Sequence, residues 1–181
     1  FGPAEGIDWH AVAWRGRPLF ASREVAWALD VRRPTPAPRA GRAVRIPSGA
    51  IVGIDGLAAA RHGGIDEVLY RGTMPPHVLR PSEGASVPGQ RTLVYEGSAR
   101  AAIAQFPKNV NLTATIALAG VGFDRTRVEL LVDPAVEDNV HELHVRGAFG
   151  SYSARVCGRR IQPSSPSSRL VAGSLLEAAL G

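Results

Sequence analysis

Three strand-like segments that follow one another closely constrain the fold more than any other feature. They are "RVELLVDP" (127–134), "HELHVRGAFG" (141–150) and "SYSARVCGR" (151–159). Parallel neighbours need long crossover connections, whereas antiparallel neighbours need only short turns. The short connections here therefore predict an antiparallel meander of three strands.

The chain beyond residue 46 adds two further strands and several helices. Strands are expected at 66–73 and 91–97, and helices at 47–64, 99–106, 108–120 and 164–180. Strictly alternating βαβ units are absent. The pattern predicts an α+β fold, with a mixed, largely antiparallel sheet and helices packed on one face.

Residues 1–43 differ from the rest, and we treat them as an Arg/Pro-rich leader to a domain at 44–181. The leader is expected to be disordered, or a remnant of a nucleotide-binding domain, with one short helix at 21–31. Residues 1–45 hold eight arginines and four acidic residues, so most of the net charge of +5 lies there. No nucleic-acid-binding motif accompanies this charge, and we expect no nucleic-acid partner.

Several functional classes lack their usual signals. No apolar run approaches the roughly 20 residues that span a bilayer, and no signal-peptide pattern is present, so a cytoplasmic protein without a membrane partner is expected. Cys157 is the only cysteine, and no metal-ligand spacing occurs. No strand precedes a G-x-G-x-x-G loop, which is the usual cradle for a dinucleotide pyrophosphate.

Lys108, in "FPKNVN" (106–111), is the only lysine. It stands at the expected start of a helix, where exposed amides and a cation together favour an anion. A surface lysine and a pocket for a carboxylate or phosphate both remain open. Asn109 and Asn111 are poor helix-interior residues and suit a cap. Asn111 shares a helical stripe with Thr115 and is expected to face a groove.

Two histidines in the strand at 141–150 have different environments. Alternation places His141 on the apolar face and His144 on the opposite face, so His144 is expected to be a solvated surface residue. A buried imidazole needs a partner or a role. From the strand pattern alone, His141 is either a satisfied core histidine or a general acid or base.

The chain resembles a known family over about residues 44–180. The segments "PSGAIVGIDGLAAARHGGIDEVLY", "YEGSARAAIAQFPKNVNLTATIALAGVGFDRTRVELLVDP" and "NVHELHVRGAFG" are similar to the C-terminal domain of the L-aspartate dehydrogenases. The resemblance implies a dehydrogenase C-terminal-domain-like fold. It also implies NAD- or NADP-dependent oxidative deamination of L-aspartate to iminoaspartate, which yields oxaloacetate or feeds NAD biosynthesis.

The resemblance also implies particular residue roles and a homodimer built through the sheet. His141 is the implied catalytic residue, while Asn111 and Ala50 lie at the nicotinamide cofactor. From the anion-site argument above, Lys108 with the helix N-terminus, beside Asn109, is expected to hold a carboxylate of the substrate, L-aspartate, or to orient the bound substrate.

Two departures from the family pattern keep an alternative open. Residues 1–43 do not resemble the dinucleotide-binding domain with which family members begin, and "SPSSR" (165–169) replaces the usual N-P-K-T-S segment. The alternative is a non-catalytic remnant that folds and dimerises without binding cofactor. A third interpretation, a basic nucleic-acid binder, rests on the first 45 residues alone.

Overall fold

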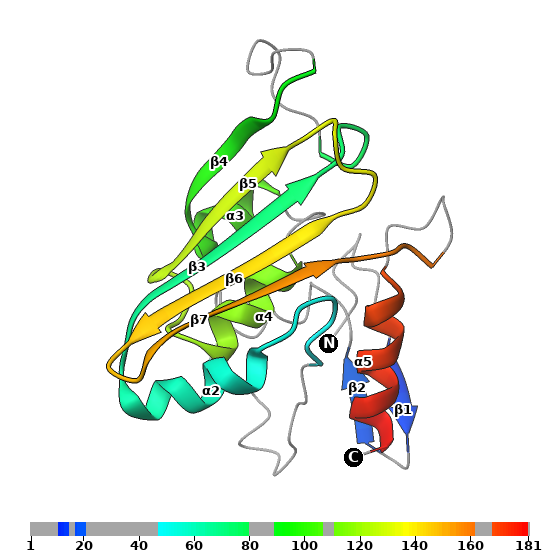
Figure 1. Ribbon diagram of the computed structural model, residues 1–181. Helices are drawn as coiled ribbons and strands as arrows, with labels where there is room; N and C mark the ends of the chain where they lie inside the picture. The colour runs from blue at the N-terminus through cyan, green and yellow to red at the C-terminus, as the bar shows by residue number, and fades with distance from the viewer. Residues whose placement is uncertain are drawn as a thin grey trace.

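The computed structural model describes residues 11–14, 17–20, 47–79, 89–106, 111–161 and 168–180. Its centre is one twisted sheet with helices behind it (Figure 1). The sheet contains β3 (Ile65–Met74), β4 (Thr92–Ser98), β5 (Thr126–Val132), β6 (Val140–Gly147) and β7 (Gly150–Cys157). The helices are α2 (Ile54–Gly63), α3 (Ala99–Gln105), α4 (Asn111–Ala119) and α5 (Arg169–Leu180).

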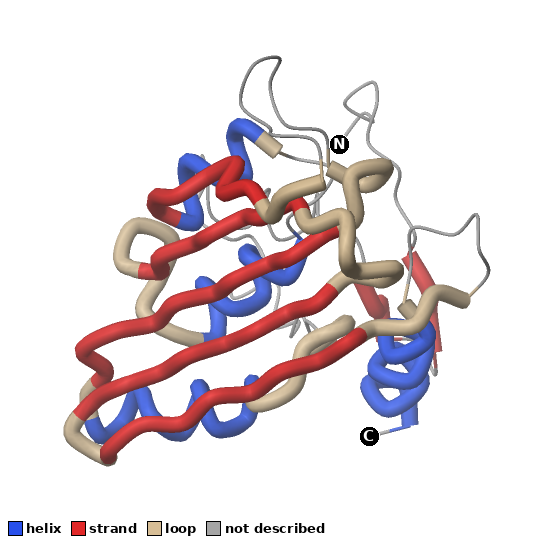
Figure 2. Tube along the Cα trace, turned by 45° about the horizontal axis from the view of Figure 1, so that its top comes forward, coloured by secondary structure: helices blue, strands red, loops and turns tan. Residues whose placement is uncertain are grey.

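The strand order in the sheet is β4-β5-β3-β6-β7. All neighbouring strands are antiparallel except β3 and β5, which are parallel. Helices α2, α3 and α4 lie on one face, as the tube view shows from a second angle (Figure 2). The predicted α+β class, with a mixed, largely antiparallel sheet and helices on one face, is confirmed.

The predicted meander is wrong at one point. β6 and β7 form a hairpin, but β3 lies between β5 and β6. Residues 133–139 therefore step across one strand, which is a distance of roughly 10 Å between the outer two strands. β3 is the longest strand of the sheet and has many buried positions. Its central place gives its apolar side chains neighbours on both sides.

The hydrophobic core lies between the sheet and its helices. Alternate residues of the three central strands face this layer. The buried strand residues include Val68, Tyr70, Met74, Val128, Leu130, Val132, Leu143 and Val145. Leu57 of α2 and Ile116 of α4 are fully buried against them. This layer fixes which strand positions are shielded from water.

The helix expected at 47–64 begins only at Ile54. Gly49 and Gly53 have φ values of 70° and 81°, in the left-handed region that interrupts a right-handed helix. Residues 47–53 consequently form an irregular turn before α2. By contrast, the predicted cap of the next helix is confirmed, because Ser98 Oγ accepts a hydrogen bond from the backbone N–H of Ala101 at 3.3 Å.

The leading part of the chain contributes a two-stranded hairpin that the sequence pattern did not predict. It consists of β1 (Ala11–Trp14) and β2 (Arg17–Phe20), with β2 beside α5 (Figure 1). The expected helix at 21–31 lies outside the described residues, and the boundary at residue 43 stays a prediction. No helix in the described ranges is long and apolar enough to cross a bilayer.

Candidate functional site

His141 lies near the start of β6, on the helix-covered face of the sheet. It pairs with Gly72 of β3 on one side and with Val156 of β7 on the other. Only 7% of its surface is exposed. The alternation in the sequence therefore assigned His141 to the correct face. An imidazole at this depth requires a hydrogen-bonding partner.

Tyr70 supplies that partner. Its hydroxyl oxygen Oη lies 2.9 Å from Nδ1 of His141. The two rings are stacked, with centroids 6.1 Å apart and planes inclined by 23°. Tyr70 is completely buried, so this hydrogen bond forms away from water.

Gly72 makes room for this contact. Tyr70 stands opposite Leu143 in the register, so His141 is its diagonal neighbour rather than its direct partner. The tyrosine must lean along β3 past position 72 to reach the histidine. A Cβ atom at Gly72 would lie 2.9 Å from the Tyr70 hydroxyl oxygen. The missing side chain leaves the space that the hydroxyl group uses.

Burial determines the charge of both groups. Loss of solvent lowers the pKa of His141 to about 4. The same cause raises the pKa of the Tyr70 hydroxyl well above its usual range. Near pH 7 the pair therefore consists of a neutral imidazole and a protonated phenol. A neutral imidazole has one donor and one acceptor nitrogen, which suits proton handling in a partly closed site.

His144 differs from its prediction as a solvated surface residue. It is half-buried on the opposite face of the sheet, and its Nδ1 lies 2.8 Å from Ser153 Oγ. Its Nε2 is buried and has no hydrogen-bond partner within the described part of the chain. Cross-strand neighbours on a sheet face cover much of a side chain even where no helix lies above it.

The two residues expected at the cofactor belong to adjoining segments. Ala50 is buried in the turn at 47–53, and Asn111 is the exposed first residue of α4. A Cβ atom at Gly49 would lie 3.3 Å from Leu112 Cδ2, so the turn packs against the start of α4. Between described residues, no hydrogen bond joins either segment to His141.

Lys108 and Asn109 lie outside the described residues. Their roles in holding substrate therefore stay predictions, as does the groove expected beside Asn111.

Tyr70 and Gly72 were not predicted from the sequence as parts of the site. A signal was present, because a tyrosine in the middle of an apolar strand needs a partner for its hydroxyl group. That partner lies 71 positions further along the chain. Finding it requires the register between β3 and β6, which strand patterns alone do not specify.

Comparison with known proteins identifies the family. The family model described as "Aspartate dehydrogenase, C-terminal" matches residues 55–181, which is most of the chain. The chain belongs to the aspartate dehydrogenase family. The resemblance stated from the sequence motifs is thus confirmed.

Curated relatives in the aspartate dehydrogenase family support this assignment. The chain is 66% identical over 145 residues to L-aspartate dehydrogenase 1 of Bordetella pertussis, covering 80% of this chain and 56% of that protein. It is 42% identical over 148 residues to L-aspartate dehydrogenase of Ralstonia pickettii, covering 78% and 55% respectively. The chain spans about half the length of the curated relatives it matches.

A solved structure agrees with the fold. The crystal structure of aspartate dehydrogenase from Thermotoga maritima matches with a TM-score of 0.60 and 32% sequence identity. The match covers 76% of this chain and 52% of that one. The mixed sheet is therefore shared with an aspartate dehydrogenase.

Proposed function

We propose that this chain forms the C-terminal, substrate-handling part of an NAD(P)-dependent L-aspartate dehydrogenase. The reaction is the oxidative deamination of L-aspartate to iminoaspartate, with oxaloacetate and ammonia as the hydrolysis products. The observation that carries the proposal is the buried, neutral His141, held by Tyr70 in a chain that belongs to this family.

His141 is the proposed acid/base residue. Because Nδ1 is engaged by Tyr70, Nε2 is the ring nitrogen left for contact with substrate. A histidine in contact with the substrate can transfer protons to or from an amine or a water molecule, although burial adds a free-energy cost to its charged form. Oxidation of an amino acid and hydrolysis of the imine both require such proton transfers.

The described residues suit the carboxamide of a nicotinamide. NAD or NADP, when bound, supplies the acceptor for the hydride that leaves the α-carbon of aspartate. The exposed side-chain amide of Asn111 both donates and accepts hydrogen bonds, as does a nicotinamide carboxamide. Ala50 is small, which leaves the adjoining turn unobstructed by a longer side chain. We infer that these two residues contact the cofactor, while Lys108 and Asn109 bind the substrate carboxylates.

The test is aspartate-dependent reduction of NAD and NADP by the 181-residue chain, beside the same chain with His141→Ala. We expect the variant to lose about 10²–10⁴-fold in kcat, the range typical of a missing acid/base group. Reduction that is unchanged in the variant would contradict the role of His141. A folded chain that neither binds nor reduces either cofactor would favour the alternative of a non-catalytic remnant.

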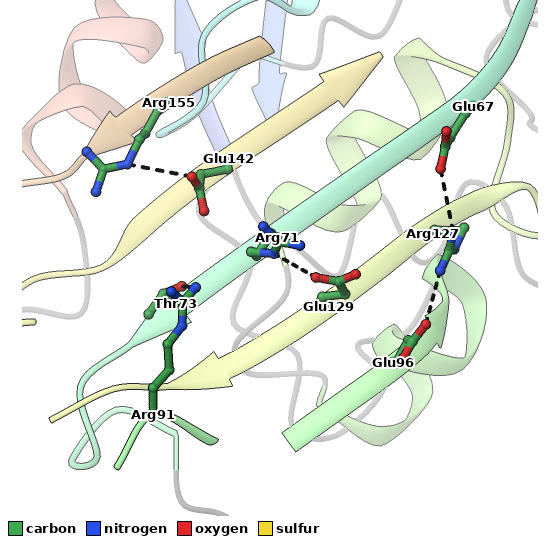
Figure 3. A network of polar contacts seen from close by, with 9 residues as sticks. All are labelled: Glu67, Arg71, Thr73, Arg91, Glu96, Arg127, Glu129, Glu142 and Arg155. Atoms are coloured by element: carbon green, nitrogen blue, oxygen red, sulfur yellow. Dashed lines mark hydrogen bonds and ion pairs between the residues drawn. The ribbon is translucent and has the colours of Figure 1, made fainter. Parts of the chain in front are cut away.

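We also propose a homodimer formed through the face of the sheet that α2, α3 and α4 leave uncovered. This face carries a network of ion pairs (Figure 3). Arg71 Nε lies 2.6 Å from Glu129 Oε2, and Arg127 bridges Glu67 and Glu96 at 3.5 and 3.0 Å. A surface most of whose charges are already paired within one copy can meet an identical surface with little repulsion.

Apolar side chains on the same face support the dimer. Leu93 is 49% exposed and stands opposite Leu131 across the β4/β5 pair. A second copy would cover these leucines.

Analytical ultracentrifugation tests this arrangement. Leu93→Glu places a charge in the proposed interface, and we expect at least a tenfold weaker dimer. Leu176→Glu is the matched control, because Leu176 is 60% exposed on α5, away from this face. A dimer that survives Leu93→Glu but dissociates with Leu176→Glu would place the interface elsewhere.

Narrower expectations from the sequence stay predictions. They are the choice between NAD and NADP, the link to NAD biosynthesis, the cytoplasmic location and the absence of a nucleic-acid partner. The kinetic assay above addresses the first, since both cofactors are compared under identical conditions.

A further inference from the structure

We propose that Tyr70 is a positioning residue that fixes the tautomer of His141, with Gly72 providing the space for it to do so. The tautomer is the one with a bare Nδ1 and with the proton on Nε2. The inference rests on the proposed function only in its consequence for catalysis. The tautomer itself is a property of the folded chain.

The direction of the hydrogen bond follows from the partners of the Tyr70 hydroxyl group. Within the described residues, Nδ1 of His141 is its recorded hydrogen-bonding partner. A buried O–H group that lacks an acceptor is costly, so Tyr70 must donate to Nδ1. A neutral imidazole whose Nδ1 accepts carries its hydrogen on Nε2. The reverse arrangement would satisfy the ring but leave the tyrosine proton without an acceptor among the residues that the structure describes.

The sheet geometry makes this contact specific. Gly72 lies directly opposite His141, and Tyr70 lies two residues earlier on the same face of β3. The hydroxyl oxygen occupies the space beside Gly72. Any side chain larger than that of glycine would fill part of this space. The ring of Tyr70 is completely buried, so it has little freedom to move elsewhere. In β3, the glycine two residues after Tyr70 therefore allows the hydroxyl group to reach the neighbouring strand diagonally.

Among the described residues, the charged groups around the pair do not compete with Tyr70. On the strands next to His141, the nearby charged side chains are Arg71, Glu142 and Arg155, and their register places all three on the opposite face. On the face that His141 occupies, its direct neighbour on β7 is the uncharged Val156.

Helix α2 packs against β6 and also carries titratable residues. These are Asp55, Arg61 and His62, and all three are exposed. Tyr70 is thus the titratable group that contacts His141 within the described part of the chain.

The consequence is a refined role for the histidine. At rest, Nε2 is a hydrogen-bond donor toward the substrate, suited to a carboxylate oxygen or a developing negative charge. It becomes a proton donor only after Nδ1 has itself been protonated, which requires Tyr70 to give up its hydrogen bond. Tyr70 therefore favours the neutral ring, and its removal should make His141 easier to protonate.

Nitrogen NMR of the histidine side chains tests the tautomer without requiring activity. In the full chain near pH 7.5, we expect a pyridine-type Nδ1 and a pyrrole-type Nε2 for His141, assigned by their loss in His141→Gln. A pyrrole-type Nδ1 in the unmodified chain would overturn the proposal, whatever the kinetic assay shows. A missing activity with the expected tautomer would instead count against the proposed function alone.

Tyr70→Phe tests the cause. It removes one oxygen atom and keeps the ring, and we expect a mixture of tautomers, an upward shift in the pKa of His141, and at least a tenfold loss in kcat where activity is present. Tyr95→Phe is the matched control. Tyr95 also precedes a glycine by two residues, but its hydroxyl group donates to the Ser98 carbonyl oxygen at 2.8 Å. An unchanged tautomer in Tyr70→Phe would refute the positioning role.

Gly72→Ala tests whether the Tyr70 hydroxyl group needs the space left by the missing side chain at position 72. We expect it to reproduce the spectral change of Tyr70→Phe, because the new methyl group displaces the hydroxyl group. When Tyr70→Phe is already present, adding Gly72→Ala should alter the His141 signals little further. Additive effects of the two substitutions on the tautomer would contradict a shared mechanism.

Discussion

At the scale of single residues, burial makes His141 a source of pH-dependent stability. Its pKa is about 4 in the folded chain, against about 6.5 for an unperturbed histidine. Between these two values the unfolded chain binds a proton that the folded chain does not. Stability is therefore unaffected above about pH 6.5 and falls as the pH is lowered from there toward 4.

We predict that this histidine costs the fold about 3 kcal/mol between pH 7 and pH 4. His141→Gln should remove that part of the decline, as measured by urea unfolding at several pH values. His62→Gln, at an exposed position on α2, should leave the decline unchanged. Parallel pH profiles for the His141→Gln variant and the unmodified chain would show that His141 is protonated at little cost.

The sheet face on which His141 lies could be predicted from the sequence, because the pattern that indicates it lies within one strand. Alternation along β6 shows which side chains share a face, and this placed His141 correctly. It did not show what covers the other face, and so His144 was predicted to be solvated although its Nε2 is buried. Tyr70 was missed because its partner belongs to a distant strand.

At the scale of secondary-structure elements, two glycines show how closely the α2–β3 turn packs against the end of β6. A Cβ atom at Gly147 would overlap the backbone oxygen of Gly64. Backbone atoms cannot turn aside as a side chain does. At Gly63, the last residue of α2, an added Cβ atom meets no atom of the described residues within 4 Å.

We predict opposite effects of alanine at these two positions. Gly147→Ala should lower the free energy of unfolding by about 1–3 kcal/mol, because β6 must move away from the turn. Gly63→Ala should raise it by about 0.5–1 kcal/mol, since alanine is the better helix residue. Thermal unfolding of both variants checks the pair. A stable Gly147→Ala variant would mean that the turn moves without cost.

Most helices and strands could be predicted from the sequence, and the predictions that were wrong have local causes. The strands at β3, β4, β6 and β7 and the cap at Ser98 follow from alternation and from a preferred capping residue. The turn at 47–53 was mistaken for helix because its apolar spacing is helical. The two left-handed glycines there outweigh that spacing.

At the scale of the whole molecule, the position of each strand in the sheet determines how readily that strand opens. β3 has hydrogen-bonded neighbours on both sides and pairs with strands distant from it in the sequence. β4 and β7 are at the edges. Edge strands open more readily than central ones, because one side of their backbone lacks a partner strand.

We predict that amide hydrogen exchange is slowest in β3, intermediate in β5 and β6, and fastest in β4 and β7. Hydrogen-exchange mass spectrometry of the native chain measures this order directly. Faster exchange in β3 than in β7 would show that the sheet opens from its centre rather than from its edges.

The strand order could not be predicted because it depends on competition among strands for the central place. The short connections correctly indicated the β6/β7 hairpin, but nothing local showed that β3 inserts beside β6.

The proposed catalytic histidine and the proposed dimer interface lie on opposite faces of the same sheet. In β6, His141 faces the helices, and its neighbour Glu142 faces the uncovered side and lies 3.7 Å from Arg155. A substitution reaches only one of these surfaces. The loss or gain of one residue within β6 would exchange all of its side chains between the two faces. Natural variation in this strand should therefore proceed by replacement, while changes in length are confined to the connections on either side of it.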